Sequence, residues 1–257
     1  MPSRRDFLRT TSGAAAIIAA PSLLLRSRAT ADIIVRNGTV FDGLGTPGKE
    51  LDVVISGARI TSLVRGSKDR GAIEIDARGL AVAPGFIDIH SHGDGSLWSD
   101  PRAESLIRQG ITTIVVGQDG SSRAPRANGD GKEDDSRRQF TTFAQLWTAL
   151  GRLQPSVNVA SMVGLGTVRD VVVGGDNRPA TADELARMEQ LVRAAIADGA
   201  CGASSGLEYT PGAFAPREEL IELCKPLAKL GLPYATHMRN EDDQLIEAID
   251  EAIASMS

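Results

Sequence analysis

The feature that most constrains this chain is an alternation of apolar, strand-like runs with amphipathic helical patterns after Pro84. We expect strands at 86–90, 111–117, 157–163, 200–204 and 233–237, and helices around 103–109, 140–150, 182–198, 216–230 and 242–253. Short apolar strands that are each followed by a helix form a parallel sheet with both faces covered. The pattern therefore predicts an α/β fold, either a doubly wound sheet or a (β/α)8 barrel of the TIM type.

The preceding segment, 32–84, has a different residue pattern. Val, Ile and Thr alternate with polar residues, and the pairs Asn37-Gly38, Asp42-Gly43 and Ser56-Gly57 supply turns. We expect a small antiparallel β unit here. The predicted organisation is thus a leader at 1–31, a small β domain at 32–84 and the βα region at 85–257.

The N-terminal leader has the order of an export signal. Arg4 and Arg5 precede a short, Ala-rich apolar run that is broken by Pro21 and ends before small residues that suit cleavage after Ala31. The paired arginines resemble a Tat-type signal peptide. An ordinary amphipathic N-terminal helix is the alternative. The signal predicts a periplasmic or secreted protein with no membrane attachment after cleavage. Disulfides form in such compartments, but Cys201 lies in a predicted strand and Cys224 in the middle of a predicted helix, so we expect buried free thiols.

The charge balance bears on the partners. The formal net charge is -5, whereas nucleic acids and anionic membranes favour a basic surface. We expect a small soluble substrate and no nucleic-acid partner. The sequence does not indicate an oligomeric state.

All three histidines close predicted strands. His90 and His92 are two residues apart in "APGFIDIHSHGDG", so both imidazoles can point to one side at the end of the first strand. His237 closes the fifth strand, and Asp119 follows the second. Active sites of parallel barrels lie at this edge, and imidazole and carboxylate are zinc ligands. The four residues are candidate metal ligands; turn histidines, a core His237 and an Asx-turn Asp119 are the structural alternatives.

Several segments resemble the amidohydrolase superfamily, within it the N-acyl-D-amino-acid deacylases. They are "VAPGFIDIHSH", "GITTIVVG", "NVASMVGLGTVR", "GASSGLEYTPGAFA" and "YATHMRNE". The resemblance implies a barrel beside a small β-sandwich domain, and hydrolysis of N-acyl-D-amino acids to a D-amino acid and a carboxylate. It also implies one or two zinc ions, or another divalent metal, that activate water and polarise the acyl carbonyl. By motif position His90 and His92 match ligands of one metal position, His237 matches a ligand of the tightly held zinc, and Tyr209 faces the substrate.

The chain departs from the family pattern at three points. Asp119 stands where these enzymes usually carry a cysteine ligand, and Leu165 stands where relatives often have histidine. Five predicted strands fall short of eight, and the residues after Pro84 are fewer than the about 250 of a complete barrel. The family's catalytic aspartate belongs to later strands, beyond the chain end. We therefore expect a partial or truncated chain that has little hydrolytic activity by itself.

Other functions remain open at this point. "GASSG" fits the G-x-S-x-G pattern of serine hydrolases with Ser204 as nucleophile, but Pro211 and Gly212 follow where that motif needs a helix. "GLGTVR" lacks the third glycine of a dinucleotide-binding turn. Within the superfamily, a dihydroorotase-like or isoaspartyl dipeptidase-like enzyme is the alternative. A non-enzymatic alternative is an inactive remnant that only binds metal.

Overall fold

A computed structural model describes residues 29–127 and 138–256. The predicted signal peptide lies almost wholly outside the described residues. Contacts between Cα atoms divide the chain into two compact units, Met1–Pro84 and Gly85–Ser257, which are described separately below. No helix in the described part of the chain is long and apolar enough to cross a membrane.

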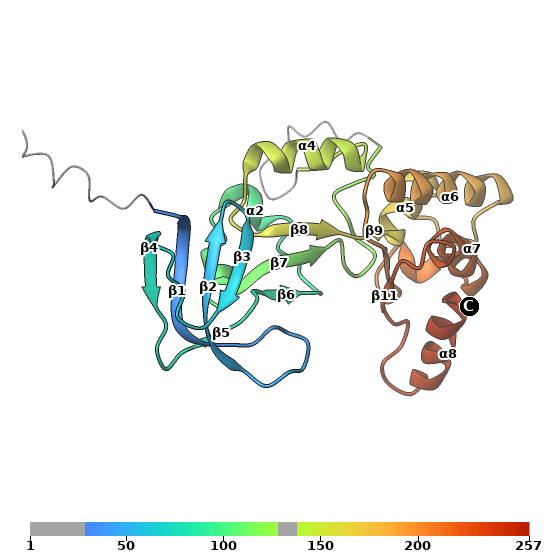
Figure 1. Cartoon of the computed structure of the whole chain (residues 1–257). Coiled ribbons are helices and arrows are strands. Elements are labelled where there is room, and N and C mark those ends of the chain that lie inside the picture. The colour runs from blue at the N-terminus through green and yellow to red at the C-terminus, as the bar shows by residue number, and fades with distance from the viewer. Residues whose placement is uncertain (1–28, 128–137, 257) are drawn as a thin grey trace, which may run out of the picture. The chain divides into compact units, whose positions relative to one another are not determined.

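The small unit is a five-stranded sheet. Its strands are β1 (Ala31–Val40), β2 (Lys49–Ser56), β3 (Arg59–Val64), β4 (Gly71–Asp76) and β5 (Ala81–Val82). β2 pairs antiparallel with β1 and with β3, whereas β4 and β5 run parallel to β1 (Figure 1). The prediction of a purely antiparallel unit was therefore wrong for β4 and β5.

Arg36 explains the parallel pairing of β4. Its guanidinium donates hydrogen bonds to the carbonyl oxygens of Ser67 (3.1 Å) and Asp69 (2.8 Å) in the connection between β3 and β4. It also pairs with Glu74 on β4, with an Nε–Oε2 distance of 2.8 Å. These contacts hold the connection against β1, the strand with which β4 pairs in parallel. The described strands of this unit form one sheet, so the β-sandwich stays a prediction.

The described residues of the large unit form six short strands, all in parallel pairs. They form two three-stranded sheets in the orders β6-β7-β8 and β11-β10-β9. The strands are β6 (Phe86–Asp88), β7 (Ile111–Val116), β8 (Asn158–Ser161), β9 (Val163–Gly164), β10 (Ala203–Gly206) and β11 (Tyr234–His237). The third predicted strand is interrupted at Met162, where the chain passes from the first sheet to the second. The α/β class is confirmed.

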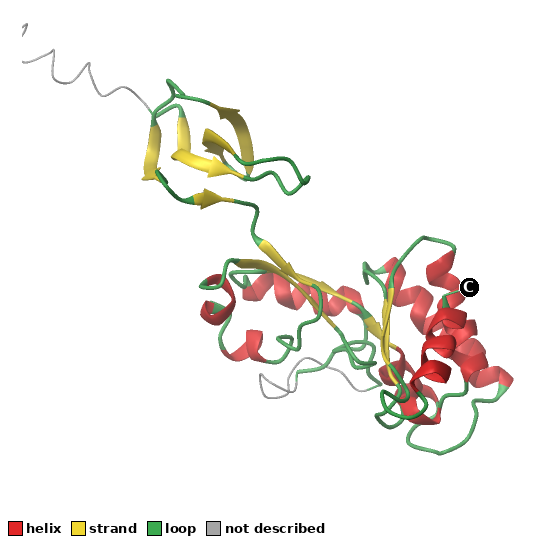
Figure 2. Ribbon diagram, turned by 90° about the horizontal axis from the view of Figure 1, so that it is seen from below, coloured by secondary structure: helices red, strands yellow, loops and turns green. Residues whose placement is uncertain are grey.

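Helices follow the strands (Figure 2). They are α2 (Ser96–Ser99), α3 (Glu104–Ile107), α4 (Phe143–Leu153), α5 (Leu165–Val172), α6 (Ala182–Ala197), α7 (Arg217–Ala228) and α8 (Leu245–Ser255), with a 3-10 turn, η2 (Gly212–Phe214). Five of the α-helices correspond to predicted ones. The predictions missed the four-residue α2 and also α5, which begins immediately after β9 and carries β-branched residues and a glycine that weaken a helical pattern.

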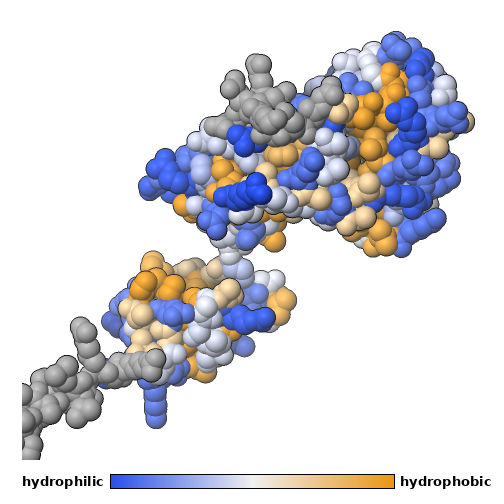
Figure 3. Space-filling view, turned by 90° about the horizontal axis from the view of Figure 1, so that it is seen from above, coloured by the Kyte–Doolittle hydropathy of each residue, from blue (hydrophilic) through white to orange (hydrophobic). Residues whose placement is uncertain are grey.

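The core of the large unit is built mainly by α5, α6 and α7 against the second sheet. Val163 and Ala203 of the strands and Met188 and Val192 of α6 are completely buried. A buried ion pair between Arg169 on α5 and Glu219 on α7 joins two of these helices, with an N–O distance of 2.6 Å. On the face that Figure 3 shows, both units carry patches of hydrophobic residues among hydrophilic ones.

The two cysteines are free thiols, as predicted. Cys224 is buried within α7, and this burial raises the pKa of its thiol to about 12. Cys201 is half-buried and precedes β10 instead of lying within it, because the pairing of that strand begins at Ala203. Neither thiol has the depressed pKa of a reactive cysteine.

Candidate metal centre

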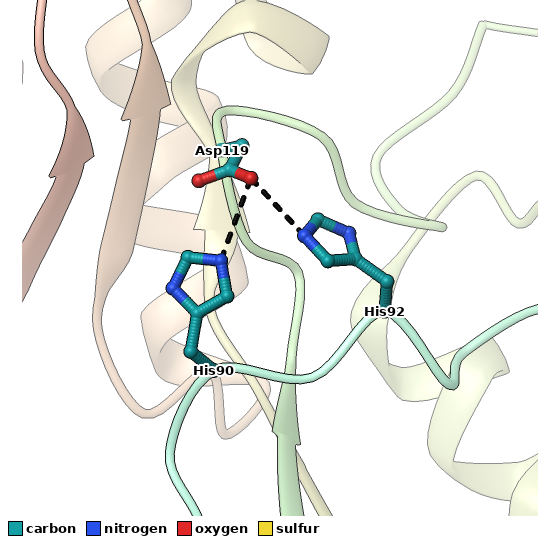
Figure 4. Close-up of side chains that lie close together, drawn as sticks. All are labelled: His90, His92 and Asp119. Atoms are coloured by element: carbon teal, nitrogen blue, oxygen red, sulfur yellow. Dashed lines mark hydrogen bonds and ion pairs between the residues drawn. The ribbon is translucent and has the colours of Figure 1, made fainter.

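His90 and His92 lie just beyond β6, in a segment that bends at Ile89 and His90. The strand ends at Asp88 and not at His90, but the Ser91 N–H still donates to the Val115 carbonyl oxygen of β7 at 3.0 Å. Ser91 is buried, and both histidines are exposed. The chain bends at Ile89 and His90, and both imidazoles nevertheless point to the Asp119 carboxylate (Figure 4).

Asp119 comes from the turn after β7. Its backbone is left-handed, with φ of +51°, and its neighbours Gly117 and Gly120 have φ of +75° and +73°. Aspartate tolerates this conformation better than most residues, and glycine adopts it readily. The turn reverses the chain and points the Asp119 carboxylate at the two imidazoles.

Three potential ligand atoms converge here. Asp119 Oδ2 lies 3.0 Å from His92 Nε2 and 3.4 Å from His90 Nε2. One ligand atom from each of the three residues lies within 4.8 Å of the other two. Figure 4 shows both rings directed at the same carboxylate. The carboxylate is largely shielded from solvent whereas the imidazoles are accessible, so the group is open on the histidine side.

Gln118 ties the two ligand-bearing segments together, and the sequence analysis missed it. Its side chain is 2% exposed, and its Nε2 donates to the carbonyl oxygens of Ile89 (2.9 Å) and Val115 (3.1 Å). Ile89 directly precedes His90. Nothing in the sequence distinguishes this glutamine from an exposed turn residue, because its role depends on the neighbouring segment that it contacts.

His237 belongs to a different group. It ends β11 as predicted, but its Nε2 lies 3.3 Å from Glu208 Oε2, and its Nδ1 lies 3.4 Å from the Tyr209 hydroxyl. The structure thus brings together three of the four predicted ligands and places His237 with Glu208 and Tyr209. Glu208 was not among the predicted site residues, although it precedes Tyr209 in "GLEYTPG".

A cleft of about 640 Å³ reaches part of the three-residue cluster and also Tyr209, the neighbour of His237. His92 and Asp119 line it from one side, and Tyr209 lines it together with the glycines Gly206 and Gly212. Tyr209 is 49% exposed, so its hydroxyl is accessible from the cleft. Arg126 and Asp170, an ion pair with an N–O distance of 3.2 Å, also line the cleft. The cleft has the size of a small-molecule site and combines metal-ligand chemistry with a phenolic hydroxyl.

Two further residues singled out in the sequence are buried. Leu165, which stands where the resemblance leads us to expect histidine, is 3% exposed at the start of α5 and packs in the core. Ser204 is completely buried, and its hydroxyl bonds to the backbone of the Asp119 turn. This burial leaves no approach for a substrate and argues against the serine-hydrolase alternative.

The fold and the cluster together define an α/β protein with a potential metal site at the carboxyl ends of parallel strands. A sequence profile described as the amidohydrolase family matches residues 74–253. The chain therefore belongs to the amidohydrolase family.

Two relatives from Alcaligenes xylosoxydans xylosoxydans are similar to this chain in sequence. The chain is 39% identical to a D-aminoacylase over 226 residues, which are 86% of this chain and 47% of the relative. It is 40% identical to an N-acyl-D-aspartate deacylase over 241 residues, which are 88% of this chain and 47% of the relative. The chain thus spans about half the length of the relatives it matches.

Solved structures show the same similarity. A crystal structure of D-aminoacylase superposes with a TM-score of 0.81 at 40% identity, over 88% of this chain and 49% of that one. An N-acyl-D-glutamate deacylase from Bordetella bronchiseptica was solved with zinc and a phosphonate that mimics the tetrahedral intermediate. It superposes with a TM-score of 0.81 at 32% identity, over 88% of this chain and 48% of that one. D-aminoacylase itself has a binuclear metal centre.

Proposed function

We propose that this chain carries part of the active site of a metal-dependent hydrolase that cleaves the amide of N-acyl-D-amino acids. The observation that carries the proposal is the convergence of His90, His92 and Asp119, whose ligand atoms lie within 4.8 Å of one another; His92 and Asp119 also line the cleft. The identity of 39–40% to D-amino-acid deacylases supports the substrate class. Because the chain spans about half of those relatives, the activity is proposed for a protein that includes their remaining part.

The fold proposal is the N-terminal part of a (β/α)8 barrel beside a β-sandwich domain. Sequential parallel strands with helices after them are the repeating unit of such a barrel. The chain passes from one sheet to the other within a single residue, Met162, which supports a continuous barrel wall.

The donor set fits a divalent metal such as zinc. Tetrahedral zinc with ligands at 2.0–2.1 Å separates neighbouring ligand atoms by about 3.3 Å. Asp119 Oδ2 lies 3.0 and 3.4 Å from the two imidazole nitrogens, close to that spacing. We propose that these residues hold one metal and that His237 contributes to a second position. When bound, the metal supplies Lewis acidity for the acyl carbonyl and lowers the pKa of water.

The remaining residues of the cleft would bind and orient the substrate. Tyr209 presents its hydroxyl to the cleft while its ring packs edge-on against His237, with ring centroids 4.9 Å apart. It is placed to donate a hydrogen bond to a carbonyl oxygen of the substrate. The glycines Gly206 and Gly212 allow the backbone segments that line the cleft to pack closely, since a Cβ at either would lie within 2.5 Å of a carbonyl oxygen.

Export and partners complete the proposal. The paired arginines Arg4 and Arg5 support a Tat-type leader and a periplasmic or secreted location. The net charge of -5 supports a small soluble substrate over nucleic acid or membrane.

The test is to express the complete gene, to purify its product in the presence of zinc, and to measure amide hydrolysis. We expect hydrolysis of a panel of N-acetyl-D-amino acids and at least about tenfold slower hydrolysis of the L enantiomers. Equal turnover of both would contradict the assignment. Preference for dihydroorotate or an isoaspartyl dipeptide would favour the related alternatives, and zinc binding without any turnover would indicate a metal-binding remnant.

A further inference from the structure

Ser204 on β10 bonds to both ends of the Asp119 turn. Its hydroxyl donates to the Gly117 carbonyl oxygen at 2.6 Å and accepts the Gly120 N–H at 3.0 Å. The side chain is completely buried. A single hydroxyl therefore links the first and last residues of the four-residue segment that contains Gln118 and Asp119.

The same strand approaches the turn at a second point. Gly206 lies two residues after Ser204 and so on the same side of β10. A Cβ at Gly206 would lie 2.2 Å from the Asp119 carbonyl oxygen, so glycine is required for this contact. The Gly120 carbonyl oxygen also accepts the Thr167 N–H at 2.9 Å. The turn is thus fixed to β10 and α5, not merely to its own strand.

This fixation matters because the turn has an unusual conformation. Gly117, Asp119 and Gly120 all have positive φ, which a free segment rarely adopts in sequence. The hydroxyl of Ser204 offsets this cost with two buried hydrogen bonds, since a buried backbone group without a partner is costly. Without the Ser204 hydroxyl, the Gly117 carbonyl oxygen and the Gly120 N–H would each lose this hydrogen bond.

We propose that Ser204 is a positioning residue for Asp119. Its hydroxyl selects the turn conformation in which the Asp119 carboxylate points at His90 and His92. The consequence for metal binding rests on the proposed function, whereas the consequence for the turn does not. The serine of the G-x-S-x-G pattern thereby has a role without acting as a nucleophile.

The matched test compares Ser204→Ala with Ser205→Ala. Ser205 is also buried, at 1% exposed, but its hydroxyl contacts Tyr234 Oη (2.6 Å) and Thr236 Oγ1 (2.7 Å) on the other side of β10. Both variants lose one buried hydroxyl from the same strand. Only the first loses the contacts with the Asp119 turn.

Two measurements on the metal-free chain report on the turn. We expect the Gly120 amide to exchange hydrogen about 2- to 10-fold faster in Ser204→Ala, the effect of one lost hydrogen bond, and to be unchanged in Ser205→Ala. The chain has three histidines, so their imidazole NMR signals are readily assigned. The signals of His90 and His92 should shift in Ser204→Ala, whereas Ser205→Ala should leave them in place.

The third measurement is zinc affinity, determined by competition with a chromophoric chelator. We expect Ser204→Ala to weaken zinc binding about 10- to 100-fold, as loss of an outer-shell partner does, and Ser205→Ala to change it less than about threefold. Equal affinity in the two variants, or unchanged His90 and His92 signals in Ser204→Ala, would overturn the inference. If the wild-type chain binds no zinc, the proposed metal centre fails, and the two metal-free measurements still decide the role of Ser204.

Discussion

At the scale of single residues, the Asp119 carboxylate lies 3.0 and 3.4 Å from the imidazole nitrogens of His92 and His90, which makes these three side chains the candidate ligands of one metal ion. The spacing of His90 and His92 and the position of Asp119 after a strand placed all three at one edge of the sheet. Gln118 and Ser204 could not be predicted, because their hydrogen bonds join segments far apart in the chain. The separation of His237 from the cluster also depends on how far apart the ends of β7 and β11 lie, which the pattern does not encode.

Asp119 gives the prediction at this scale. Asp119→Ala removes the oxygen shared by both imidazoles and should lower zinc affinity at least about tenfold, whereas Asp119→Cys supplies a softer thiolate donor and should retain binding. Asp170→Ala is the control, because Asp170 lines the same cleft but lies outside the cluster. Calorimetric titration with zinc measures all three variants. An Asp119→Ala variant with wild-type affinity would exclude Asp119 as a ligand.

At the scale of elements, local signals predicted α6 and failed at α5. Thr181 accepts the Glu184 N–H at 3.3 Å, and the Glu184 carboxylate accepts the Thr181 N–H at 2.8 Å, which is a complete capping box. This start signal is visible in the sequence. The N-terminus of α5 has no side-chain cap and directly follows β9, so no local signal separates the two elements.

The capping box supports a stability prediction. Thr181→Ala should lower the free energy of unfolding by about 0.5–2 kcal/mol, because helix-terminal N–H groups lose their acceptor. Thr148→Ala is the matched control, since Thr148 is exposed within α4, where alanine has the higher helix propensity. Chemical denaturation of both variants measures the difference. An equal effect of the two substitutions would show that the cap contributes nothing.

The pairing of β1 with β4 is predicted to depend on pH. The hydrogen bond from Arg36 is the main cause that lowers the pKa of Glu74 from 4.5 to about 2. A carboxyl whose pKa is lowered in the folded state stabilises that state above its unfolded pKa, and this contribution is lost as pH falls from about 4.5 to about 2.

Glu74→Gln should therefore unfold the small unit more easily at pH 7 and lose this difference near pH 2. Thermal unfolding followed by the NMR signals of Ile34 and Val54, in the core of this unit, measures the effect. Glu50→Gln on β2 is the control, since Glu50 is exposed and forms no ion pair with the residues that the structure describes. A difference between Glu74→Gln and wild type that persists at low pH would contradict the assignment.

At the scale of the whole molecule, the first and last described strands of the large unit, β6 and β11, each pair with a neighbouring strand on one side only. Large apolar side chains are exposed beside them, including Ile87 at 61% and Ile89 at 73% on the β6 side. Unpaired strand edges and apolar patches favour association. The interruption of the third predicted strand at Met162 could not be predicted, because it depends on tertiary pairing.

We therefore expect the 257-residue chain to self-associate with rising concentration. Ile246 and Ile253 on α8 are 67% and 60% exposed, and replacing both with lysine should shift the weight-average mass towards the monomer. Leu44→Lys, in a loop of the small unit, is the control for added charge on an exposed residue. Sedimentation velocity over a concentration series measures the effect. A wild-type chain that stays monomeric throughout would contradict this expectation.

The central claim is that His90, His92 and Asp119 hold a metal ion, and anomalous diffraction from zinc-soaked crystals of the chain tests it most directly. We expect an anomalous peak at about 2.0–2.2 Å from His90 Nε2, His92 Nε2 and one Asp119 oxygen. The peak should be absent from crystals of Asp119→Ala treated in the same way. Zinc bound elsewhere, with no peak between these three side chains, would contradict the claim.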